Sequence, residues 1–187
     1  MPDSPTLKSP ITKVYAAADA GAALTLADET DKAKMIVRTP DGTAARSSLS
    51  VDFASSKTID GVLVAGSRPD EWMLIGDAAA VASMVDELPV DGHVSTIDWT
   101  HGRAIFRLTG ESAPSALEKV CGLDLSESMT PDGAVTSGSV ASVTCDMIRN
   151  DVSGIRSYMI LVDRSFGQYL FDALLDAGDE FGIGVAG

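Results

Sequence analysis

One short segment gathers four residue types that could do chemistry. Asp98-Trp99-Thr100-His101-Gly102-Arg103 holds an acid, an indole, an imidazole and a guanidinium side by side. Arg103 could bind a carboxylate through two parallel hydrogen bonds, and His101 could hold or transfer a proton near neutral pH. The alternative is a tight connection between two strands, with Trp99 in the core and Arg103 paired with Asp98. We favour the structural interpretation over a subunit contact, and a subunit contact over catalysis.

A second cluster, Arg68-Pro69-Asp70-Glu71-Trp72, admits a structural and a binding interpretation. Pro69 and Asp70 are typical turn residues, and such a turn would lead into a strand that buries Trp72. Alternatively, an exposed Trp72 would serve as an aromatic anchor for a partner protein. We favour the turn and the buried tryptophan.

The sequence lacks the usual signatures of enzyme sites. It has neither the Gly-x-Ser-x-Gly turn of many hydrolases nor the phosphate-binding Gly-x-x-x-x-Gly-Lys loop. Residues 182–187 match Gly-x-Gly-x-x-Gly, but a dinucleotide site needs a helix directly after this motif and none follows. His93 and His101 have no second histidine or cysteine at metal-ligand spacing. We therefore expect no catalytic, cofactor-binding or metal-binding residue in this chain.

The composition is that of an acidic globular protein. The 187 residues include 27 acidic and 14 basic side chains, a formal net charge of −13, and 45% are hydrophobic. This charge disfavours binding to nucleic acid or to an anionic membrane. No apolar run approaches the roughly 20 residues of a membrane helix, and residues 1–10 do not resemble a signal peptide. We expect Cys121 and Cys145 to be buried and reduced and the protein to be cytoplasmic.

Strands and helices are expected to alternate along the chain. Apolar runs predict strands over 34–39, 61–66, 71–76, 93–99, 104–109, 134–140, 143–150 and 157–162. Apolar residues at helical spacing predict helices over 78–88, 113–121 and 165–177, the first of them capped by Asp77. The pattern predicts an α+β fold of two related lobes, each a mostly antiparallel sheet with helices packed on one face.

Composition also predicts the domain boundaries. Residues 1–34 are rich in Ala, Asp, Thr and Pro, and we expect them to form an extended arm outside the core. Residues 35–187 are expected to form a single domain. Its two lobes would comprise residues 35–90 and 91–182, followed by a flexible C-terminal tail.

Four segments, in order along the chain, resemble the gamma subunit of heterotetrameric sarcosine oxidase. They are Arg68-Pro69-Asp70-Glu71-Trp72-Met73-Leu74, Asp98-Trp99-Thr100-His101-Gly102-Arg103-Ala104, Cys121-Gly122-Leu123-Asp124-Leu125 and Arg164-Ser165-Phe166-Gly167-Gln168-Tyr169-Leu170. The similarity extends over about residues 60–182. It implies a fold similar to the N-terminal part of folate-dependent aminomethyltransferases, the relatives of the glycine-cleavage T protein.

The resemblance implies a non-catalytic subunit that holds no cofactor itself. In that family the gamma subunit packs on the large alpha subunit, which carries NAD and the folate-binding domain. The beta subunit carries FAD, FMN lies between alpha and beta, and delta is a small zinc-binding subunit. The assembled heterotetramer oxidatively demethylates sarcosine to glycine, produces hydrogen peroxide and passes the one-carbon unit to tetrahydrofolate.

The sequence is also compatible with two other functions. One is a stand-alone folate-binding protein that transfers one-carbon units, as aminomethyltransferases do, although this chain is about half their length. The other is a scaffold subunit of a different amine-oxidising complex. For a subunit of either complex, we expect the partner interface at Trp99, His101 and Arg103, and on the exposed side of the last helix at Gln168 and Asp172.

Overall fold

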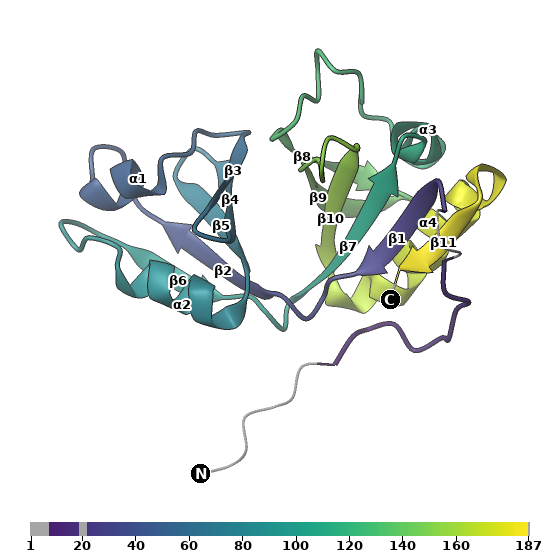
Figure 1. The fold of residues 1–187 in the computed structure, drawn as a ribbon. Helices are drawn as coiled ribbons and strands as arrows, with labels where there is room; N and C mark the ends of the chain where they lie inside the picture. Colours follow the sequence, from purple (N-terminus) through teal and green to yellow (C-terminus); the bar gives the residue numbers. More distant parts are fainter. Residues whose placement is uncertain (1–7, 19–21, 187) are drawn as a thin grey trace, which may run out of the picture.

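Within residues 8–18 and 22–186, which the computed structural model describes, the chain forms two β-sheets (Figure 1). The larger sheet has six strands in the order β11-β1-β7-β10-β9-β8. Neighbouring strands are antiparallel, except that β1 and β11 are parallel. The strands are β1 (Leu24–Asp28), β7 (Arg103–Gly110), β8 (Val135–Val140), β9 (Val143–Arg149), β10 (Ser157–Asp163) and β11 (Ile183–Ala186).

The smaller sheet has five strands in the order β3-β4-β5-β2-β6, all antiparallel. They are β2 (Ala33–Arg38), β3 (Ser56–Ile59), β4 (Val62–Arg68), β5 (Glu71–Gly76) and β6 (Ser95–Asp98). Every residue of β5 is buried because both faces of the strand are covered. Trp72 and Leu74 pack on the helix side, and Met73 and Ile75 pack against the larger sheet.

Two helices cover the outer face of each sheet. α1 (Ala44–Leu49) and α2 (Ala78–Asp86) pack on the smaller sheet, and α3 (Ala113–Glu118) and α4 (Gly167–Gly178) pack on the larger one. Short 3-10 turns, η1 (Arg164–Phe166) and η2 (Asp179–Phe181), flank α4. Asp77 caps α2 as predicted, because its carboxylate accepts hydrogen bonds from the N–H groups of Ala79 and Ala80.

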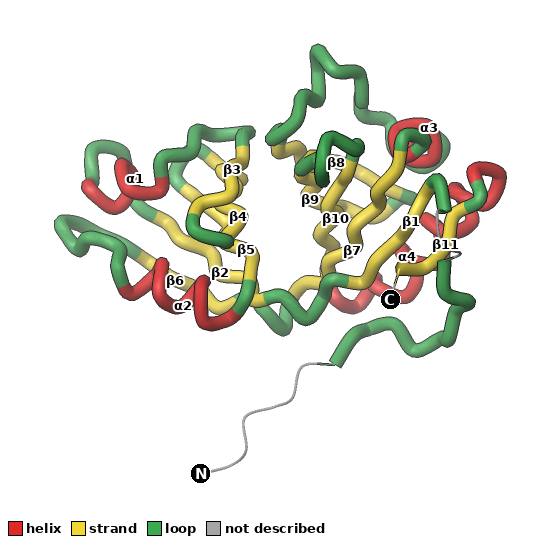
Figure 2. The backbone as a smooth tube through the Cα atoms, viewed as in Figure 1, coloured by secondary structure: helices red, strands yellow, loops and turns green. Residues whose placement is uncertain are grey.

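The inner faces of the two sheets share an apolar layer. Leu63 and Met73 of the smaller sheet belong to one buried cluster with Ile105, Ile148 and Leu161 of the larger sheet. The layers therefore follow the order helix, sheet, sheet, helix (Figure 2). This architecture confirms the predicted α+β class, with mostly antiparallel sheets and helices on one face of each.

The structure differs from the predicted boundaries in three places. β1 lies within the predicted arm 1–34, and its Leu24 and Leu26 are fully buried in the core of the larger sheet. β11 lies in the predicted flexible tail but pairs with β1. The chain passes between the sheets at 29–32 and again at 99–102, not once near residue 90, because β6 pairs with β2 and stays in the smaller sheet.

Candidate functional site

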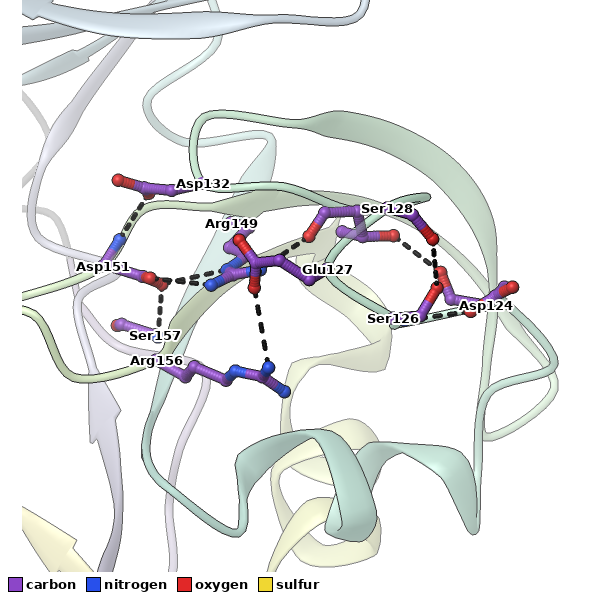
Figure 3. Close-up of polar contacts among 10 residues, drawn as sticks. Asp124, Ser126, Glu127, Ser128, Asp132, Arg149, Asp151, Arg156 and Ser157 are labelled. Carbon is purple, nitrogen blue, oxygen red and sulfur yellow. Dashed lines mark hydrogen bonds and ion pairs between the residues drawn. The ribbon is translucent and has the colours of Figure 1, made fainter.

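A network of charged side chains lies at the end of β9 in the larger sheet (Figure 3). Arg149, the last residue of β9, is only 3% exposed. Its Nε and Nη2 donate to the two carboxylate oxygens of Asp151 at 3.1 and 2.9 Å. Its Nη1 donates to Glu127 Oε2 at 2.7 Å and to the carbonyl oxygen of Thr130 at 2.8 Å. One guanidinium thus joins the sheet to the long loop between α3 and β8, which rises above the sheet in Figure 2.

Further polar contacts fix the course of this loop. The carboxylate of Asp124 accepts a hydrogen bond from the Ser126 N–H at 2.9 Å, which closes a turn. The carboxylate of Asp132 accepts one from the Asp151 N–H, also at 2.9 Å. Because Glu127, Thr130 and Asp132 all bind Arg149 or Asp151, the loop is anchored at the end of β9 without a helix or strand of its own.

The charges of the network are paired with one another. Burial raises the pKa of Asp151, but hydrogen bonds from Arg149 and from the Ser157 N–H outweigh this effect and hold the pKa below its usual range. The same contact with Asp151 raises the pKa of Arg149. Four of the five N–H groups of Arg149 are bound within the chain, so this guanidinium is not free to bind a substrate carboxylate.

Tyr158 lies on β10 directly across from Arg149 and is completely buried. Its hydroxyl has no hydrogen-bond partner among the described residues. Burial raises the pKa of this phenol, so it stays protonated at neutral pH. Tyr158 is therefore a neutral, buried side chain whose hydroxyl forms no hydrogen bond with the described residues of the network.

A second polar centre lies where the chain passes between the sheets. Lys34 of β2 is 1% exposed, and its Nζ donates to the carbonyl oxygens of Thr30 and Lys32, both at 2.8 Å, and of Thr100 at 3.1 Å. One ammonium group therefore holds both connecting segments together. Burial, with the nearby charge of Arg164, lowers the pKa of Lys34 to about 8.

A cavity of about 420 Å³ lies beside Lys34, and Asp98, Thr100 and His101 also line it. The N–H of Thr100 donates to the carboxylate of Asp98 at 2.9 Å and is the main reason that the pKa of Asp98 is lowered. Lys34 and Asp98 thus bind backbone groups and not each other. Among the described residues the cavity has the polar groups of a small binding site but no hydrogen-bonded acid–base pair.

The structure brings Trp99 and Arg103 together, as the sequence predicts, but in contacts within the chain. Trp99 packs against the apolar layer between the sheets, and the guanidinium of Arg103 lies 4.6 Å from the centre of its ring. Arg103 forms an ion pair with Asp146 of β9 at 3.3 Å. The predicted ion pair between Arg103 and Asp98 is wrong, because Arg103 pairs with Asp146 and the Asp98 carboxylate accepts a hydrogen bond from the Thr100 N–H. Of the predicted interface residues in this segment, His101 is the exposed one.

The other two predicted interface residues bind the N-terminal segment, residues 8–18. The side-chain oxygen of Gln168 accepts hydrogen bonds from the N–H groups of Thr12 and Lys13 at 2.8 and 3.3 Å. Asp172 forms an ion pair with Lys13 at 2.6 Å and also binds the hydroxyl of Tyr15. This part of α4 is therefore already covered by the chain itself, and a contact of Gln168 and Asp172 with another subunit stays a prediction.

The described residues contain no group of three or more His, Cys, Asp or Glu side chains that could hold a metal ion. Cys121 and Cys145 are buried and unpaired, as predicted. Burial raises the pKa of Cys145 to about 12, so its thiol is not a nucleophile at neutral pH. No helix in the described part of the chain is both long and apolar enough to cross a membrane.

Sequence reasoning missed both polar centres. Lys34 directly precedes the apolar run Met35-Ile36-Val37, and Arg149 directly follows Met147-Ile148. A basic residue joined to a buried strand is a weak signal of a buried cation with several partners. The partners themselves lie far away in the sequence, so no spacing rule could have named them.

Comparisons with known proteins identify a family and similar solved structures. Residues 51–187, more than half of the chain, match the model of the GCVT N-terminal domain family. No curated protein matches the sequence. A chain of heterotetrameric sarcosine oxidase from Corynebacterium sp. U-96, solved with pyrrole 2-carboxylate, superposes with a TM-score of 0.74 at 21% identity, over 89% of this chain and 89% of that one.

The glycine cleavage system aminomethyltransferase T from Bartonella henselae superposes with a TM-score of 0.69 at 15% identity. The match covers 89% of this chain but 48% of that protein, so this chain spans about half of its length. At these identities the two structures show a shared fold, and the family match carries the assignment. The chain therefore belongs to the GCVT N-terminal domain family.

Proposed function

We propose that this chain is a non-catalytic subunit of a heterotetrameric sarcosine oxidase, equivalent to gamma, and that it docks on the large alpha subunit. The observation that carries the proposal is the reciprocal match to one chain of the Corynebacterium enzyme, in which nearly all of each chain is aligned. The match covers 89% of that chain but only 48% of aminomethyltransferase T, which favours the subunit over the aminomethyltransferase as the counterpart.

The polar centres support a structural role. Arg149 and Lys34 are the most deeply buried cations of the described residues, and both donate hydrogen bonds to neighbouring loops. These contacts occupy all three N–H bonds of the Lys34 ammonium and four of the five N–H groups of Arg149, so neither cation is free to act on a substrate. In this proposal the chemistry belongs to the partner chains.

The proposed complex demethylates sarcosine to glycine, reduces oxygen to hydrogen peroxide and transfers the one-carbon unit to tetrahydrofolate. Its FAD, FMN, NAD, tetrahydrofolate and zinc sites would all lie in the alpha, beta and delta subunits. The exposed His101 and its neighbours Trp99 and Arg103 remain the predicted contact in the segment between the sheets.

The family assignment itself favours a second candidate, a folate-binding protein related to aminomethyltransferases that acts without the complex. The cavity beside Lys34 would be its binding site, since it combines polar groups with an apolar wall. The third candidate is a scaffold subunit of another amine-oxidising complex. Like the first candidate, it would dock on a partner subunit that carries the chemistry.

Affinity purification through a tag on this chain separates the candidates. Under the main proposal, the eluate from the native cells is yellow, oxidises sarcosine and contains one large, one medium and one small additional chain. A colourless 19.4 kDa chain that binds tetrahydrofolate in calorimetry would support the second candidate and contradict the first. A flavoprotein that oxidises a different amine would favour the third candidate.

A further inference from the structure

A cavity of about 440 Å³ opens on the smaller sheet between α1, α2 and the turn from β3 to β4. Its apolar lining comes from Leu49 of α1, Ile59 of β3, Met84 of α2 and Leu88 just after α2. These residues belong to the apolar core between the helices and the smaller sheet, or pack against it. Both helices lie on the side of the smaller sheet that faces away from the larger sheet, so the cavity lies on that side (Figure 1).

Within the described part of the chain, the two charged residues that line this cavity are both acidic. Asp60, in the turn between β3 and β4, and Glu87, the C-cap of α2, are both exposed and line it. Ser83 donates a hydrogen bond to Glu87 Oε1 at 3.0 Å and so steadies this carboxylate at the edge. Among the described residues, no lysine or arginine lines the cavity. The lining therefore combines an apolar floor with two negative charges.

The end of α2 adds to the negative potential. The carbonyl groups at a helix C-terminus carry partial negative charge, which favours cations and disfavours anions there. α2 ends at Asp86 and is capped by Glu87, and it has no basic residue in its last turn. Two acids at this position are unfavourable in the isolated chain, and a cation brought by another molecule would relieve the repulsion.

We propose that this cavity receives a segment of the large partner subunit in which a bulky apolar side chain stands beside a lysine or arginine. The inference rests on the proposed function, which supplies the partner. The apolar side chain fills the cavity over Leu49 and Met84, and the cation pairs with Asp60 or Glu87 at the end of α2. An acidic segment is excluded by the same charges.

Charge reversal tests the proposal in the complex purified through a tag on this chain. Asp60→Lys/Glu87→Lys changes two exposed side chains, but Asp60 has a positive φ of 48° in the β3–β4 turn, so circular dichroism and the Tm of the isolated variant first establish that it folds. Recovery of the flavin-containing partner should fall at least about tenfold. Glu111→Lys/Asp179→Lys makes the same change in net charge at exposed acids outside this cavity, and recovery should stay near the wild-type level.

Two further measurements do not depend on charge reversal. Ala80→Trp fills the cavity but keeps both acids, and it should reduce recovery of the partner as strongly. A zero-length carbodiimide should couple the carboxylate of Asp60 or Glu87 to a lysine of the large subunit, and mass spectrometry should identify the linked peptides. A cross-link through either acid supports the proposal.

The outcomes separate this inference from the proposed function. If the wild-type chain recovers the flavoprotein and both cavity variants recover it equally well, the docking site is wrong and the proposed function stands. Cross-links that map only to other surfaces overturn the docking site in the same way. If the wild-type chain recovers no flavoprotein, both proposals fail.

Discussion

Replacing Arg149 by methionine tests whether the charged network is a structural anchor. The change removes the two hydrogen bonds to Asp151 and those to Glu127 and the Thr130 carbonyl. It leaves the carboxylate of Asp151, whose side chain is 13% exposed, without its cation. Breaking a buried ion pair typically costs about 3–5 kcal/mol. The Ser157 N–H still compensates Asp151, so we expect about 3 kcal/mol, the lower end of that range.

Urea denaturation followed by tryptophan fluorescence measures this loss. For a chain of this size, about 3 kcal/mol corresponds to a drop in Tm of roughly 6–12 °C. Arg156→Met is the matched control, because Arg156 is more exposed and reaches Glu127 only at 3.5 Å, and it should cost less than about 1 kcal/mol. Adding Asp151→Asn to Arg149→Met should restore part of the stability, since the unpaired charge is removed. Equal stability of wild type and Arg149→Met would refute the reasoning.

Three further predictions concern other parts of the fold. Lys34→Met should speed amide hydrogen exchange at residues 29–33 and 99–102 at least about tenfold, because the ammonium group that joins these segments is lost. The control variant Lys32→Met should change this exchange little. Unchanged exchange in Lys34→Met would contradict the role of its ammonium group in holding the two segments together. Burial raises the pKa of Glu71, but hydrogen bonds from two arginines and a serine outweigh this effect and lower the pKa below its usual value. The Glu71 carboxylate therefore stabilises the fold at a pH above its unfolded pKa of about 4.3. This stabilisation is lost as the pH falls through the pKa of Glu71 in the folded state. The stability difference between wild type and Glu71→Gln, measured by urea denaturation from pH 7 to pH 3, should therefore shrink in acid; a constant difference would contradict this. Gly167→Ala should expose the N-terminal segment, residues 8–18, to limited proteolysis, because the added methyl group meets the ring of Pro10. The free energy of unfolding in urea should change little, since alanine favours the helix. An N-terminal segment that stays uncleaved would contradict this.

The sequence predicts those elements whose pattern is local. The helix expected over 78–88 is α2, because its cap and its apolar face are both written in consecutive residues. The apolar run 71–76 is β5, and the burial of Trp72 confirms the structural interpretation of its cluster. In these places propensity, capping and hydrophobic period point to the same structure.

The sequence does not predict features that depend on distant partners. β1 and β11 are short and become strands because they pair with each other and, through β1, with β7. Arg103 joins Asp146 because β7 and β9 flank β10 in the sheet, an order that no spacing in the chain reveals. The same holds for Lys34, whose three acceptors come from two separate connections.

Native mass spectrometry of the assembly purified through this chain tests the central claim most directly. We expect a complex with one copy each of four different chains, in which sarcosine bleaches the visible absorbance of the flavin under anaerobic conditions. The 19.4 kDa chain should dissociate from it without flavin. A mass equal to this chain alone, or a complex that sarcosine does not reduce, would contradict the assignment of this chain as a subunit of a sarcosine oxidase.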